Sequence, residues 1–148
     1  MTSNLSIHRY GCGVTADATC YPDRMAGIVF LGTTDLERIK TFYTERVGMD
    51  HWLAQEGIEI LRHENMLIGF QQKEEAYTDA LLTFYYPQRN DVDRAYAEFE
   101  DAALHPPRER PQFRIYNFFA RDPEGRTIEF QTFLHALPEG PQPWGATE

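Results

Sequence analysis

The segments Ile68-Gly69-Phe70-Gln71-Gln72 and Ile128-Glu129-Phe130-Gln131-Thr132 repeat one pattern, and this repeat decides the fold. A matching pair of stretches, Thr34-Asp35-Leu36-Glu37 and Asn90-Asp91-Val92-Asp93, precedes the two segments in the same order. The repeated order predicts one supersecondary unit that occurs twice. The copies differ where the first has Gly69 and the second has the carboxylate of Glu129.

The composition narrows the class of protein. The chain has 148 residues, 42% of them hydrophobic, which is enough to bury the core of one domain. A net charge of −9 argues against binding to nucleic acid or to anionic membrane surfaces. We expect no membrane span, because no apolar run approaches the roughly 18–20 residues that a bilayer requires, and no signal peptide.

The division of the chain follows from its composition. We expect an N-terminal extension over 1–25, one domain over 26–134 with modules at 26–75 and 79–134, and a C-terminal tail over 135–148. Both cysteines, Cys12 and Cys20, fall in the extension, and with His8 they match no standard zinc spacing. A disulfide framework is therefore not expected, and we expect a cytoplasmic, reducing setting.

Periodicity and turn residues predict the order βαβββ in each module. We expect Thr34, with Glu37 in a capping box, to begin the first helix, Gly48 to end it, and Asn90 to begin the second helix. The predicted strands are Gly27–Thr33, His51–Gln55, Ile58–Arg62, Met66–Gln72, Leu81–Tyr86, Phe113–Arg121 and Thr127–Phe133. The predicted buried helix faces are Leu36, Ile39, Phe42, Tyr43 and Val47, and then Val92, Ala95, Tyr96, Phe99 and Ala103.

Two stretches resemble a known family. The hairpin Phe118–Phe130, with Asp122-Pro123-Glu124-Gly125 at its turn, is similar to the closing hairpin of the vicinal oxygen chelate (VOC) superfamily. The segment Ile28–Glu37 is similar to that family's first strand and helix start, and the likeness spans roughly residues 26–133. The family includes glyoxalase I, extradiol dioxygenases, fosfomycin-resistance enzymes and bleomycin-resistance proteins. The resemblance implies an α+β fold of two βαβββ modules that form a curled eight-stranded cup.

The resemblance also implies where a metal would be held. The family's metal enzymes bind one divalent ion through His and Glu at four strand positions, which fall here on Ile28, Gly69, Leu81 and Glu129. Three of these four residues have no donor side chain, whereas catalytic sites use about three protein ligands. We therefore expect no cofactor, with one divalent metal on shifted ligands as the alternative. We expect His51, His63 and His105 to be surface or structural residues.

Strand alternation, together with the resemblance, predicts the lining of the cup. If Glu129 faces inward, Gln131 does too, while Ile128 and Phe130 pack against the helices. We expect Gly69, opposite Glu129, to leave an open, aromatic-lined space for a small molecule. The predicted ligand-binding residues are Phe30, Gly69, Gln71, Thr83, Tyr85, Asn117, Phe119 and Gln131.

Two functions remain open at this point. In the first, the protein binds a planar or amphipathic small molecule without a metal, as bleomycin-resistance-type members do, and Glu129 pairs with a cationic or hydrogen-bond-donating group. In the alternative, the chain is an enzyme of the VOC family (lyase, isomerase or dioxygenase-like) that uses Glu129 as a general base or as a remaining metal ligand. The resemblance and the commonness of isologous pairs imply a homodimer, side by side or with exchanged modules.

Overall fold

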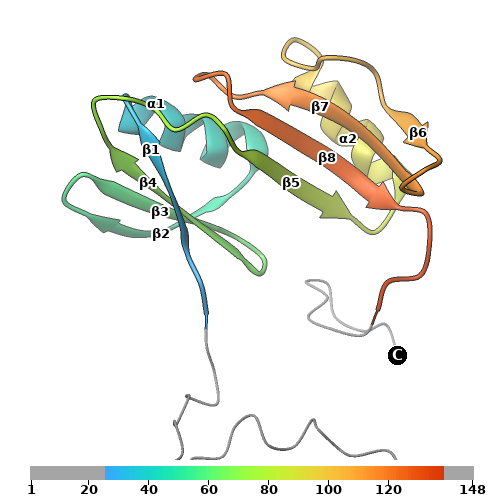
Figure 1. The fold of residues 1–148 in the computed structure, drawn as a ribbon, viewed down its shortest axis with the longest axis horizontal. Helices are drawn as coiled ribbons and strands as arrows, with labels where there is room; N and C mark the ends of the chain where they lie inside the picture. Colours follow the sequence, from blue (N-terminus) through green and yellow to red (C-terminus); the bar gives the residue numbers. More distant parts are fainter. Residues whose placement is uncertain (1–25, 139–148) are drawn as a thin grey trace, which may run out of the picture.

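The computed structural model describes residues 26–138, so the N-terminal extension and its cysteines lie outside the described residues. The expected α+β fold with two βαβββ modules is confirmed (Figure 1). The described part contains no helix long and apolar enough to cross a membrane. The first module contains β1 (Val29–Thr33), α1 (Leu36–Thr41), the π-helical segment η1 (Phe42–Val47), β2 (Asp50–Gln55), β3 (Ile58–His63) and β4 (Met66–Gln72). The second contains β5 (Leu81–Tyr86), α2 (Arg89–Phe99), β6 (Arg108–Arg110), β7 (Ile115–Arg121) and β8 (Thr127–Phe133).

The two modules have the same topology, as the repeat in the sequence predicts. Their four-stranded sheets have the orders β1-β4-β3-β2 and β5-β8-β7-β6. In each sheet the first and last strands of the module pair in parallel, and the other neighbours are antiparallel. Figure 1 shows the first module on the left and the second on the right, with α1 and α2 each beside its own sheet. The cup is thus built from two sheets rather than one closed barrel.

Both predicted N-terminal helix caps, Thr34 and Asn90, are wrong. Asp35, not Thr34, caps α1, because its carboxylate accepts a hydrogen bond from the backbone N–H of Arg38 at 3.1 Å. The Thr34 hydroxyl instead donates to Glu124 of the second module at 3.1 Å. The second helix begins at Arg89, so Asn90 lies inside it, and the backbone N–H of Gln88 donates to Asp91 at 3.2 Å.

The end of the first helix follows the prediction at Gly48, although by way of a π-helical turn. Gly48 has a φ of 90°, which a residue without a side chain adopts at little cost, and its N–H bonds to the carbonyl of Tyr43. The predicted helix face is correct, since Ile39, Phe42 and Tyr43 are buried.

The region before β7 differs most from the prediction. The short strand β6 was not predicted, and β7 begins at Ile115 rather than at Phe113. Phe113 lies in the turn that joins the two strands, where its N–H donates to the carbonyl of Arg110 at 3.1 Å. The next residue, Arg114, has a φ of 53°, so the chain at this point is not extended.

One hydrophobic core joins the modules. Phe42 of the first module lies edge-on to Phe99 of the second, with 6.0 Å between ring centroids. Phe130 of β8 contacts the rings of Phe84, Phe99 and Phe118. The helices and sheets of both modules therefore pack around one hydrophobic core.

A buried ion pair also joins the two modules. Arg126, which is 0% exposed, donates to Asp122 at 2.5 Å and to the carbonyls of Tyr77 at 2.9 Å and Gly32 at 3.0 Å. The phenol of Tyr43 donates to the same carboxylate of Asp122 at 2.8 Å. Asp122 thus connects the helix of the first module with the closing hairpin of the second.

Candidate functional site

Glu129 lies in the middle of β8, where 6% of the residue is exposed and two donors hold its carboxylate. Asn117 Nδ2 donates to Oε1 at 2.6 Å, and Thr83 Oγ1 donates to Oε2 at 2.8 Å. These residues meet because β8 lies between β5 and β7, with Glu129 beside Thr83 on one side and beside Phe119 on the other. The predicted alternation along β8 is confirmed, since Ile128 and Phe130 are fully buried in the core on the other face.

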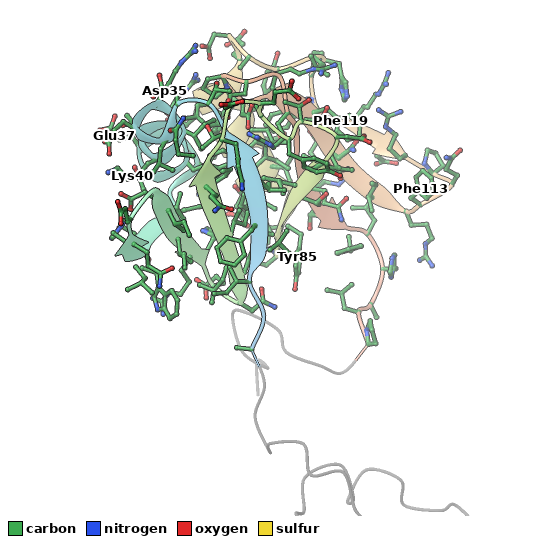
Figure 2. The ribbon with its side chains drawn as sticks, turned by 60° about the vertical axis from the view of Figure 1, so that its left-hand side comes forward. Asp35, Glu37, Lys40, Tyr85, Phe113 and Phe119 are labelled. Atoms are coloured by element: carbon green, nitrogen blue, oxygen red, sulfur yellow. The ribbon has the colours of Figure 1, made fainter. Side chains whose placement is uncertain are left out.

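A cavity of about 520 Å³ opens beside this carboxylate. It contains four of the predicted residues, Asn117, Phe119, Glu129 and Gln131. The remaining lining residues are Leu81, Arg110, Phe113, Ile115 and Phe133. In Figure 2, Phe113 and Phe119 lie on the same side of the molecule, away from Asp35, Glu37 and Lys40 on the first helix. The cavity is therefore formed by the second module alone.

The sequence analysis missed Phe113, Ile115, Phe133 and Arg110 of this cavity, and Arg110 is the charged residue among them. Its Nε donates to Asn117 Oδ1 at 3.3 Å, and its guanidinium carbon lies 5.7 Å from the centroid of the Phe119 ring. Arg110 is the last residue of β6, a strand of three residues whose charged sequence and neighbouring prolines give no strand signal. The sequence gives one indication of its position: on a strand, Arg108 and Arg110 would face the same side of the sheet and Glu109 the other.

The predicted residues of the first module lie elsewhere. Phe30, Gly69 and Gln71 belong to the sheet of β1 and β4, and they do not line the cavity beside Glu129. The expectation of open space at Gly69 is wrong, because a Cβ there would lie 2.4 Å from two ring carbons of Phe30. Phe30 and Gly69 are register partners on neighbouring parallel strands, so the ring of Phe30 covers the glycine.

Tyr85 does not line the cavity beside Glu129, and it lies between the two modules. It lines a second cavity of about 300 Å³, together with Thr83 and, from the first module, His63 and Met66. The ring of Tyr85 also lies edge-on to Phe133, which lines the first cavity, with 5.6 Å between centroids. Figure 2 shows Tyr85 well separated from Phe113 and Phe119.

The histidines of the described residues have partners of their own. His51 Nε2 lies 2.5 Å from Glu59 Oε2 on the first module. His63 lies edge-on to Phe84, and His105 lies edge-on to Phe119 with Nε2 at 3.4 Å from Arg110 Nη2.

The donor atoms around Glu129 do not fit a divalent ion. Within residues 26–138, no three His, Cys, Asp or Glu side chains are grouped so that they could hold one. The carboxylate of Glu129 is surrounded by a hydroxyl and an amide that donate to it, rather than by further ligands. Of the other positions that the resemblance assigns to ligands, Gly69 is covered by Phe30, and Ile28 and Leu81 have hydrocarbon side chains.

The comparisons with known proteins agree with this architecture. The profile of the Glyoxalase/Bleomycin resistance protein/Dioxygenase superfamily matches residues 25–130. Comparison with curated protein sequences gives no significant match.

Several solved structures have the same fold. A glyoxalase/bleomycin resistance protein/dioxygenase from Nocardioides has a TM-score of 0.64 at 16% identity, over 82% of this chain and 91% of that chain. The lactoylglutathione lyase from Agrobacterium tumefaciens has a TM-score of 0.60 at 19% identity, over 75% of this chain and 94% of that chain. An integron cassette protein from the mobile metagenome of Halifax Harbour Sewage Outfall has a TM-score of 0.64 at 18% identity, over 74% of this chain and 99% of that chain. At these identities the likeness establishes the fold alone.

Proposed function

The chain belongs to the Glyoxalase/Bleomycin resistance protein/Dioxygenase superfamily, and from this premise we propose that it binds a planar or amphipathic small molecule in the cavity beside Glu129, without a metal ion. The observation that carries the proposal is one buried carboxylate, fixed by two donors, in a cavity walled mainly by rings and aliphatic side chains. Small-molecule sites commonly combine such walls with a few well-placed polar groups.

Glu129 supplies the polar contact in this proposal. An ionised carboxylate accepts about four hydrogen bonds and donates none. Thr83 and Asn117 provide two of these bonds and fix the orientation of the group. The remaining acceptor positions suit a cationic or hydrogen-bond-donating group of the ligand, and such a bond to a charged acceptor in a desolvated site is stronger than a neutral one.

Metal independence is supported by the donor set. Glu129 is the carboxylate in a cavity lining whose other polar side chains include the amides of Asn117 and Gln131, whereas a catalytic metal site uses about three protein ligands. Metal analysis of protein purified without chelator is expected to find well under one equivalent per chain. Stoichiometric Ni, Mn, Fe or Zn would contradict this part of the proposal.

Thermal-shift measurements on chelator-treated protein test the binding itself. We expect saturable stabilisation by at least one member of a panel of planar compounds that contains phenol, benzamidine, 4-hydroxybenzoate and its methyl ester. Glu129→Gln should weaken that stabilisation, whereas Glu100→Gln, at an exposed residue after α2, should leave it unchanged. If the protein converts a panel compound into a product, and Glu129→Gln abolishes this reaction, the protein is an enzyme rather than a binding protein.

We also propose that the chain pairs with a second copy. Eight large hydrophobic side chains of the described residues are between 42% and 61% exposed, and four of them, Val29, Phe30, Trp52 and Leu53, belong to β1 and β2 of the first module. Exposed large apolar side chains can be buried against a second copy, and contiguous patches of them are typical of association sites. Analytical ultracentrifugation should find a dimer that Phe30→Asp weakens; a monomer at every concentration would contradict the pairing.

A further inference from the structure

Arg110 is a cation in the wall of an apolar cavity, and within residues 26–138 it forms no ion pair with a carboxylate. Its polar neighbours are Asn117 Oδ1, at 3.3 Å from Nε, and His105 Nε2, at 3.4 Å from Nη2. By contrast, Arg46, Arg89 and Arg126 each contact a carboxylate. A partly buried guanidinium that has no anion beside it, in a concave apolar site, is suited to bind one from the ligand.

Asn117 separates this cation from the acid of the site. Its Oδ1 accepts from Arg110, and its Nδ2 donates to Glu129 at 2.6 Å. The amide thus holds a guanidinium at one end and a carboxylate at the other, without a direct ion pair between them. The cavity therefore presents two polar groups of opposite sign to one ligand.

We propose that the ligand of this cavity is a planar monocarboxylate, an arene acid whose carboxylate binds Arg110 and whose hydroxyl or amine donates to Glu129. This inference rests on the proposed function and adds the chemical class of the ligand. The fork of the guanidinium matches a carboxylate in two parallel hydrogen bonds. The ring of Phe119, 5.7 Å from the guanidinium, provides an apolar surface next to the same position.

Charge favours a monoanion over a polyanion. Arg110 is a single guanidinium in the cavity lining, and Glu129 in the same lining repels a second negative charge. The net charge of −9 disfavours polyanions further. The donor group of the ligand distinguishes this class from a plain fatty or aryl acid, because Glu129 accepts and does not donate.

Isothermal titration calorimetry on the chelator-treated full chain tests the inference with 4-hydroxybenzoate and methyl 4-hydroxybenzoate, which differ in the anionic group. The wild-type protein should bind the acid about 10- to 100-fold more tightly than the ester. Arg110→Gln should remove that preference, because it should weaken the binding of the acid far more than the binding of the ester. Arg110→Lys should restore part of it, and Arg38→Gln, on the exposed side of α1, should not alter it.

The outcomes separate this inference from the proposed function. If acid and ester bind wild type equally, and both are weakened by Glu129→Gln, the cavity is the binding site and the role of Arg110 in recognising an anion is wrong. If Arg110→Gln weakens acid and ester to the same extent, the anion role is also wrong. If neither compound binds and no panel member stabilises the protein, both the inference and the proposed function fail.

Discussion

Asn117 lies between two groups of opposite charge, with Nδ2 at 2.6 Å from Glu129 Oε1 and Oδ1 at 3.3 Å from Arg110 Nε. Its side chain is nearly inaccessible, with 1% of the residue exposed. The amide can form both bonds because it carries a donor and an acceptor on one rigid plane. The geometry of the candidate site therefore depends on this residue as much as on the acid itself.

Asn117→Ala should lower the free energy of unfolding by about 1–3 kcal/mol, because it leaves the buried Glu129 carboxylate without one of its two donors. Urea denaturation at pH 7 measures the change. Gln112→Ala, in the exposed turn before β7, is the control and should stay within about 0.5 kcal/mol. Equal effects of the two substitutions would mean that Asn117 does not hold Glu129.

Gly69→Ala should destabilise the fold by about 0.5–1.5 kcal/mol, since the added Cβ would lie 2.4 Å from the ring of Phe30, which is 50% exposed and has to leave its present rotamer. The same substitution in a Phe30→Ala background should cost little, because the conflicting ring is gone. The coupling energy from this double-mutant cycle is the measurement. Additive effects would show that Phe30 does not cover Gly69 in solution.

Arg126→Met should be the most damaging of these substitutions. It removes one partner of an ion pair in which both side chains are 0% exposed, and breaking such a pair costs about 3–5 kcal/mol. It also removes the donors to Gly32 and Tyr77 that connect the modules. Arg121→Met, at an exposed arginine of β7, is the control. If Arg126→Met lowers the free energy of unfolding by no more than Arg121→Met does, the buried ion pair does not stabilise the contact between the modules.

Stability should decrease at alkaline pH. Burial, together with the Asp122 carboxylate, holds the pKa of Tyr43 well above its usual value, and burial with Asp91 raises the pKa of Tyr86 to about 12. An unfolded tyrosine ionises near pH 10, so above about that pH the unfolded state releases protons that the folded state retains. The contribution of these two neutral phenols to the free energy of unfolding is therefore complete below about pH 10, and it is lost as the pH rises above that value.

Urea denaturation between pH 8 and pH 11 measures this dependence. Tyr43→Phe should flatten the alkaline slope, whereas Tyr77→Phe, at a tyrosine that is 52% exposed, should not. An unchanged slope in Tyr43→Phe would contradict the role of this phenol.

The fold could be predicted from the sequence largely because its signals are local. The strands Met66–Gln72, Leu81–Tyr86 and Thr127–Phe133 have the predicted bounds, since apolar alternation and adjacent turn residues define them. The predicted cap at Thr34 was wrong because Glu124, far along the chain, takes its hydroxyl. No local pattern reveals that contact.

The candidate site was predictable only within one sheet. Pairing of neighbouring strands brings Asn117, Phe119 and Gln131 to the face of Glu129, and alternation alone predicts that face. The positions of Phe30 and Gln71 depend instead on how the two sheets are oriented, which the core and Arg126 determine through contacts distant in sequence. Arg110 was missed because β6 is too short for its periodicity to be recognised.

The central claim is that the cavity beside Glu129 binds a small molecule without a metal ion. Backbone amide NMR spectra of the chelator-treated protein, recorded during titration with members of the planar-compound panel, test it most directly. We predict saturable chemical-shift changes that centre on residues 115–119 and 129–133 and need no added metal. Changes confined to the first module, or changes that appear only after a divalent ion is added, would contradict the account.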